Sequence, residues 1–165
     1  MKNKTMIVSL IALVGLFSLM WWGKPNPNAT QASNIETKGS LIAEEKLYDF
    51  GAISMANGKV EKVFKITNPT SSEITLKNIE TSCMCTTAYL ESGNGEKGPF
   101  GMPGHGGGAT RTNEVINAGE SRELKVVYDP NAHGPAGVGN IDRFIYLTEA
   151  SGKILELEIK AVVTP

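Results

Sequence analysis

Cysteine and histidine are scarce in this chain, with two of each among its 165 residues. Cys83 and Cys85 share one segment, Ser-Cys-Met-Cys-Thr, while His105 and His133 each lie in a segment rich in glycine and proline. Every thiol and imidazole ligand is therefore confined to three short segments. If those segments meet in space, they form a set of ligands that suits zinc or copper.

The chain also lacks a marked excess of positive or negative charge. The formal net charge is −1, and neither acidic nor basic residues form a block. Because nucleic acids are bound through clusters of Lys and Arg, the sequence gives no support for a nucleic-acid partner. Charged residues make up 20% and hydrophobic residues 41% of the chain, as is typical of a folded domain.

Catalytic motifs are absent. The segment 93–98 matches Gly-x-Gly-x-x-Gly, but Pro99 follows where the dinucleotide-binding motif requires a helix to begin. His105 precedes three glycines, as in the oxyanion segment of esterases, yet the chain has no Gly-x-Ser-x-Gly elbow. We therefore expect no enzyme activity, with thiol redox chemistry by the two cysteines as the one activity left open.

One long apolar run is present, at the N-terminus. Two lysines precede an uncharged run from Met6 to Trp22, which as a helix would span about 26 Å of a hydrocarbon core of about 30 Å. The run is typical of either a secretory signal peptide or an uncleaved signal anchor. We expect residues 1–22 to be an anchoring transmembrane helix and residues 23–40 to be a flexible tether. The rest of the chain would then lie on the extracytoplasmic side, in the periplasm or at the cell surface.

Beyond residue 40, apolar and polar residues alternate in short runs that are separated by turn residues. The expected strands lie at Glu44–Ile53, Val60–Ile66, Ile74–Ile79, Leu124–Tyr128, Ile141–Thr148 and Leu155–Val163. Six or seven strands in residues 41–165 predict one all-β domain, an antiparallel β-sandwich, with a β-barrel as the alternative. Residues 93–108 interrupt the pattern with eight glycines and two prolines, so they predict a long loop that is either functional or disordered.

Four segments carry a resemblance to the bacterial family called domain of unknown function 1573: Phe64–Asn68, Ile79–Thr86, Ala118–Glu120 and Val126–Asp129. The resemblance covers roughly residues 41 to 163. It implies an immunoglobulin-like domain, similar to the modules named after abnormal-spindle and hydin proteins, in a secreted or anchored protein, and it implies no activity. The expected fold class is therefore an immunoglobulin-like antiparallel β-sandwich preceded by one N-terminal transmembrane helix.

The Cys-x-Cys spacing would place both thiols on one face of a strand, with Met84 on the other face. Two thiolates can then share one metal ion, and the two imidazoles would complete its coordination. A nearby methionine offers a thioether, which copper(I) accepts more readily than zinc. The sequence thus predicts a copper or zinc site, with copper favoured slightly, formed by Cys83, Cys85, His105, His133 and Met102.

Two alternatives to the metal site stay open. Positions two apart on an extended strand are about 6.6 Å apart, near the upper limit for a disulfide, so a Cys83–Cys85 bridge would be strained and suited to redox chemistry unless the strand bulges. In the other alternative the thiols act as small buried hydrophobic groups and the histidines are surface groups. The domain would then be a non-catalytic structural or interaction module with an unidentified protein partner.

Overall fold

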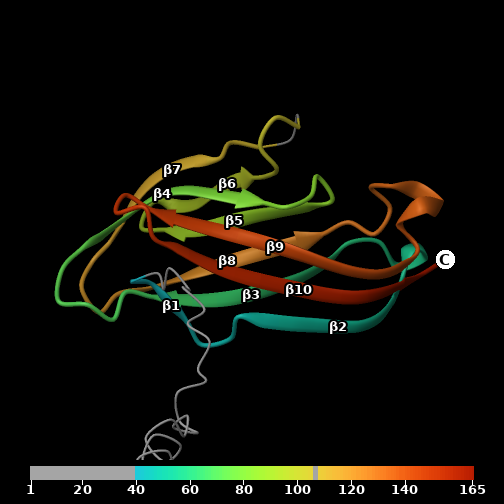
Figure 1. Ribbon diagram of the computed structural model, residues 1–165, viewed down its shortest axis with the longest axis horizontal. Coiled ribbons are helices and arrows are strands. Elements are labelled where there is room, and N and C mark those ends of the chain that lie inside the picture. The colour runs from blue at the N-terminus through green and yellow to red at the C-terminus, as the bar shows by residue number, and fades with distance from the viewer. Residues whose placement is uncertain (1–39, 106–107) are drawn as a thin grey trace, which may run out of the picture. The chain divides into compact units, whose positions relative to one another are not determined.

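Two five-stranded sheets enclose one apolar core in the computed structural model, which describes residues 40–105 and 108–165 (Figure 1). The first sheet contains, in spatial order, β1 (Ile42–Ala43), β3 (Val60–Thr67), β8 (Ser121–Tyr128), β5 (Thr86–Ser92) and β6 (Gly95–Phe100). The second contains β2 (Leu47–Ser54), β10 (Ile154–Thr164), β9 (Gly139–Glu149), β4 (Ile74–Thr81) and β7 (Arg111–Ile116). Two short 3₁₀ helices, η1 (Met55–Asn57) and η2 (Gly134–Gly137), lie in connections. The predicted β-sandwich is confirmed.

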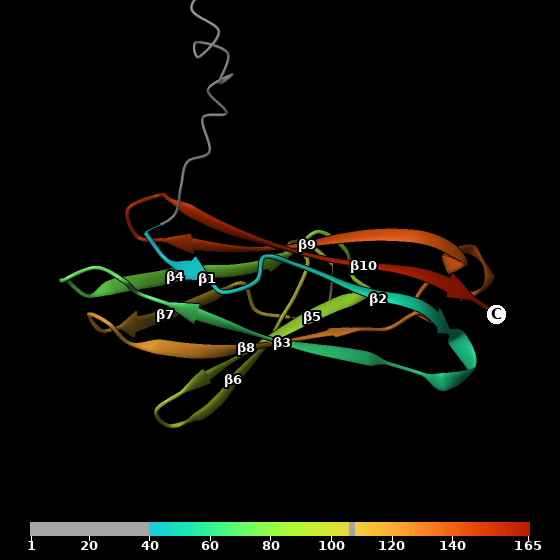
Figure 2. The same cartoon turned by 90° about the horizontal axis from the view of Figure 1, so that it is seen from below.

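Buried apolar residues alternate with more exposed residues along the strands, and the buried ones form the core between the sheets. In β10, alternate residues from Leu155 to Val163 are at most 3% exposed, whereas Glu156 and Val162 between them face solvent. Each large apolar side chain buried in this way contributes about 1.5–3 kcal/mol. Figure 2 separates the two layers, with β9 and β10 on one side and β3 and β8 on the other.

The predicted antiparallel pairing needs one correction. Among the described strands, β2 and β10 run parallel, in a register that extends from the Leu47–Glu158 pair to the Ser54–Thr164 pair. The other pairs of neighbouring strands are antiparallel. Alternation reports which face of a strand is buried, and it carries no information about the direction of the neighbouring strand.

The predicted long loop at residues 93–108 is shorter than expected. Gly93 and Asn94 form a tight turn, and β6 then pairs with β5, so the loop proper begins at Gly101. Gly98 has a φ of 139°, and a Cβ at this position would lie 2.9 Å from the carbonyl oxygen of Ala88. At this position glycine supports close approach of two strands rather than flexibility.

The predicted fold class needs a second correction. It included an N-terminal transmembrane helix, whereas the described residues form an all-β domain without one. Residues 1–22, where that helix was predicted, and nearly all of the predicted tether lie outside the described residues. Within residues 40–105 and 108–165, no helix is long and apolar enough to cross a membrane.

An ion pair between a buried carboxylate and a partly exposed lysine joins β6 to β7, the strands on either side of the next loop. Glu114, on β7, is only 8% exposed and forms an ion pair with Lys97 on β6. The hydroxyl of Ser92 donates a hydrogen bond to the same carboxylate over 3.0 Å. Burial acts to raise the pKa of Glu114, but the hydrogen bonds from Lys97 and Ser92 outweigh it and hold this pKa below its ordinary value of 4.5.

We expect the Glu114→Gln variant to be less stable than the native chain at pH 7, by about 1–3 kcal/mol, because Lys97 loses its partner. A carboxyl group whose pKa is lower in the folded state than in the unfolded state stabilises the fold fully at pH values above its unfolded-state pKa. This stabilisation is lost as the pH falls through the folded-state pKa. The difference between the two chains should therefore shrink below pH 4.5.

Urea unfolding followed by circular dichroism at pH 7 and pH 3.5 measures both effects. Glu44→Gln, which removes one partner of an exposed ion pair with Lys65, is the matched control and should change stability by less than about 0.5 kcal/mol. An equal loss of stability at both pH values in Glu114→Gln would contradict this account.

Candidate functional site

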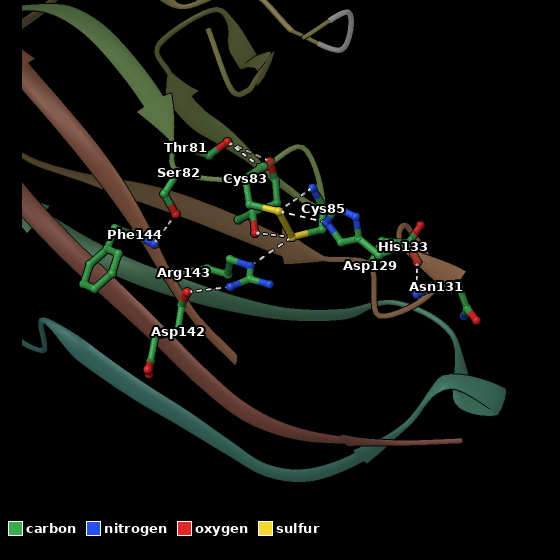
Figure 3. The surroundings of a disulfide bond; sticks show 11 residues. Thr81, Ser82, Cys83, Cys85, Asp129, Asn131, His133, Asp142, Arg143 and Phe144 are labelled. Carbon is green, nitrogen blue, oxygen red and sulfur yellow. Dashed lines mark hydrogen bonds between the residues drawn. A yellow bond between two sulfur atoms is a disulfide. The ribbon is translucent and has the colours of Figure 1, made fainter. Parts of the chain in front are cut away.

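Cys83 and Cys85 lie in the turn that joins β4 to β5 and are bonded to each other as a disulfide (Figure 3). The Thr86 amide donates to the Cys83 carbonyl oxygen over 3.1 Å, and the buried Thr81 hydroxyl lies 3.0 Å from the carbonyl oxygens of both Cys83 and Thr86. The two cysteine Cα atoms are 5.3 Å apart, within the range that a disulfide allows. The expected extended strand at this segment was wrong, because the turn brings the cysteines closer together.

The two sulfur-bearing residues have different surroundings. Cys85 is 2% exposed and belongs to the core, whereas Cys83 is half-buried and packs against the edge of the core. Met84, between them, is 55% exposed. A molecule that approaches from solvent therefore reaches the sulfur of Cys83 before that of Cys85.

His133 meets the disulfide from the connection between β8 and β9. Its Nε2 lies 3.2 Å from the sulfur of Cys83. The first residue of this connection is hydrogen-bonded to the cysteine turn, because the Asp129 amide donates to the Cys85 carbonyl oxygen over 2.9 Å. The Asn131 amide then donates to the Asp129 carboxylate, and the Asn131 side chain donates to the backbone of η1 over 2.8 Å. These bonds fix the backbone just before His133.

Arg143, on β9, lies on the other side of the disulfide (Figure 3). Its Nε donates to the sulfur of Cys85 over 3.2 Å, and its Nη1 donates to the carbonyl oxygen of Asp142. Its charge also acts on the buried Tyr128: burial raises the pKa of that phenol, and the guanidinium opposes the rise. The cysteine turn is fixed to the same strand, because the backbones of Ser82 and Phe144 are hydrogen-bonded over 2.9 Å.

Sequence reasoning missed Arg143, although a signal for it exists. Ile141, Ile145 and Leu147 of β9 point into the core, so position 143 faces the same side. A charged residue at an inward position requires a partner. Here that partner is the sulfur of Cys85, at the end of the sandwich where the disulfide lies.

Among the described residues, three predicted ligands come together. One donor atom from each of Cys83, Cys85 and His133 lies within 4.8 Å of the others. His105 is outside this group: it is exposed, and its Nδ1 lies 3.4 Å from the carbonyl oxygen of Pro103. Met102 is half-buried near the start of the same loop. Metal binding by these five residues stays a prediction.

Chemically, the site is a disulfide with one accessible sulfur and one buried sulfur. The imidazole of His133 lies beside the accessible sulfur. A permanently charged guanidinium lies beside the buried one.

Solved structures with a similar fold include a protein of unknown function from Porphyromonas gingivalis W83, with a TM-score of 0.54 and 16% sequence identity. The match covers 81% of this chain and 51% of that protein, so this chain spans about half the length of that protein. The ASH / PapD-like domain 7 of human CEP192 matches with a TM-score of 0.47 and 8% identity, over 78% of this chain and 87% of that domain. At such identities the likeness concerns the fold alone. No curated protein matches the sequence.

Residues 41–100 match the sequence profile of the family described as protein of unknown function (DUF1573). The match includes two of the four segments that carried the resemblance, Phe64–Asn68 and the cysteine segment Ile79–Thr86. The resemblance is confirmed over this part of the chain, and the two-sheet β-sandwich agrees with it. Over residues 41–100, this chain is therefore similar to the DUF1573 family.

Proposed function

We propose that this immunoglobulin-like domain is a thiol–disulfide exchange module that uses Cys83 and Cys85. One observation carries the proposal, namely the opposite surroundings of the two sulfurs. The accessible sulfur of Cys83 lies 3.2 Å from the imidazole of His133, and the buried sulfur of Cys85 accepts from the guanidinium of Arg143. A disulfide that only stabilised the fold would need neither group.

The reaction begins at Cys83, because this sulfur is the accessible one. A substrate thiol loses its proton to the His133 imidazole and attacks the Cys83 sulfur, which forms a mixed disulfide and breaks the bond to Cys85. The second thiol of the substrate dithiol then loses its proton to solvent and attacks the substrate sulfur of that mixed disulfide, while Cys85 stays a thiolate beside the Arg143 guanidinium. The substrate leaves as a disulfide, Cys83 leaves as a thiolate that regains the proton from His133, and two electrons have passed to the cysteine pair.

Arg143 supports this direction of cleavage, because it favours Cys85 as the leaving group. The thiolate released at Cys85 lies in the core, where an unpaired charge is costly. A hydrogen bond from a charged donor is worth about 1.5–3 kcal/mol, so the guanidinium offsets much of that cost. The same contact favours the reduced form over the disulfide and makes the pair more oxidising.

The disulfide supports a location outside the cytoplasm, in the periplasm or at the cell surface. Disulfides persist in oxidising compartments, while cytosolic thiols are kept reduced. A domain at such a location meets both protein dithiols and disulfides, which are the partners that an exchange reaction requires.

The predicted soft-metal function is a second candidate, and it concerns the reduced site. A disulfide offers no thiolate to a metal ion, but the dithiol would offer two thiolates next to the His133 imidazole. A third candidate is a non-catalytic interaction module, which the immunoglobulin-like fold also supports. In such a module, replacing Cys83 by Ser would leave partner binding unchanged.

We expect Arg143→Gln to make the reduction potential of the pair more negative, because the reduced form loses a charged hydrogen-bond donor. A loss of about 1.4 kcal/mol corresponds to about 30 mV for this two-electron couple. Equilibration in glutathione buffers followed by alkylation of free thiols measures the potential. Arg143→Lys, which keeps the charge, should shift it less, and Arg111→Gln, at an exposed position of β7, should leave it unchanged. A potential that stays constant or rises in Arg143→Gln would contradict this role.

We also expect His133→Ala to slow the reaction of the disulfide with dithiothreitol by at least about tenfold at pH 7, because the attacking thiol loses its proton acceptor. Stopped-flow measurement of thiol release gives the rate. His105→Ala is the matched control, since that ring lies outside the site, and its rate should equal that of the native chain. Equal rates in the two variants would count against the exchange mechanism.

A further inference from the structure

We infer that the reduced site binds one copper(I) ion through Cys83, Cys85 and His133, and that formation of the disulfide expels the ion. The inference rests on the proposed function, because only a pair that can be reduced offers two thiolates. It goes beyond that function in naming the metal, the ligand atoms and the way in which binding is controlled.

The positions of the donor atoms carry the first step. A thiolate sulfur lies about 2.3 Å from a bound soft metal and an imidazole nitrogen about 2.0–2.1 Å, so donors around one ion lie within about 4.6 Å of one another. The three donor atoms lie within 4.8 Å of one another, close to this limit. When the bond between the sulfurs breaks, they can separate by rotation of their side chains while the backbone of the turn keeps its hydrogen bonds.

Charge selects a monovalent ion. Two thiolates carry two negative charges, and the Arg143 guanidinium, 3.2 Å from the Cys85 sulfur, carries one positive charge. One copper(I) ion makes the sum zero, whereas zinc leaves an excess positive charge beside the buried Cys85. An ion pair without excess charge is the better-tolerated arrangement in a partly buried site.

The number and kind of ligands point to the same ion. Structural zinc sites are closed by four protein ligands, and the group of described residues at this site has three. Thiolates are soft ligands that select copper(I), which accepts three-fold coordination by two sulfurs and one nitrogen. The set therefore suits copper(I) without His105 or Met102, which the sequence had included.

Metal binding and the disulfide exclude each other, because both use the same two sulfurs. A disulfide of a partner protein can oxidise the copper-bound pair by exchange. The two thiolates then give two electrons to the partner disulfide, the Cys83–Cys85 bond forms, and two partner thiolates appear. Copper keeps its +1 charge throughout and leaves with the new thiolates as its acceptors. Oxidation thus becomes the signal that releases the metal.

The test is a titration of the full chain with copper(I) without oxygen, in competition with bicinchoninate, a chromogenic copper(I) chelator. After reduction, we expect one equivalent of copper per chain; the disulfide form should bind less than about a tenth of an equivalent. His133→Ala should weaken binding by at least tenfold, while His105→Ala and Met102→Leu should stay within twofold of the native chain.

Selectivity is tested with the same samples. We expect Arg143→Gln to lower the preference for copper(I) over zinc by about tenfold and Arg143→Lys to preserve it. A preference that is unchanged in Arg143→Gln would overturn the charge argument, and equal losses in His105→Ala and His133→Ala would overturn the ligand set.

Free thiols are counted in each sample with a chromogenic disulfide reagent, which separates the two proposals. Two reactive thiols per reduced chain with no bound copper would overturn the metal site and leave thiol exchange standing. Cysteines that resist reduction in the folded chain would overturn the exchange function as well.

Discussion

The turn between β4 and β5 determines the rest of the site. The Thr81 hydroxyl is buried where β4 ends and lies 3.0 Å from the carbonyl oxygens of both Cys83 and Thr86, so it closes the turn from the core side. Within the closed turn the two cysteines can bond to each other, with the second sulfur in the core and the first at its edge. The difference in accessibility between the sulfurs, and hence the direction of any exchange reaction, follows from this one arrangement.

The fold then brings two further groups to that turn. The β4–β5 and β8–β9 connections both pass from one sheet to the other, and they are hydrogen-bonded to each other through the Asp129 amide and the Cys85 carbonyl oxygen. His133 is carried by the second connection, and Arg143 by the strand that follows it. Because connections that cross between sheets lie at the ends of a sandwich, the reactive and charged side chains that they carry lie there too, while the centre remains an apolar core.

Much of the site could be predicted from residue type alone. Two cysteines in one short segment predicted sulfur chemistry, and His133 came to the site as expected. His105 did not, because β6 and the Lys97–Glu114 ion pair hold its loop on a different connection, between β6 and β7. Arg143 was missed because only the apolar residues of the alternating pattern in β9 were used to predict the strand. A charged residue at an inward-facing position was not treated as evidence for a site.

The sequence by itself determined that the domain is all-β, which residues fill its core, and that thiol and imidazole groups are confined to three segments. Alternation with a period of two and the rarity of cysteine and histidine were sufficient for these inferences. Only the tertiary structure decided that β2 lies parallel to β10, that the cysteines occupy a turn, and that His133 and Arg143 flank the disulfide. The reason is physical: His133 and Arg143 are 50 and 58 residues away from the cysteines they contact, and such pairs depend on how the connections cross between sheets.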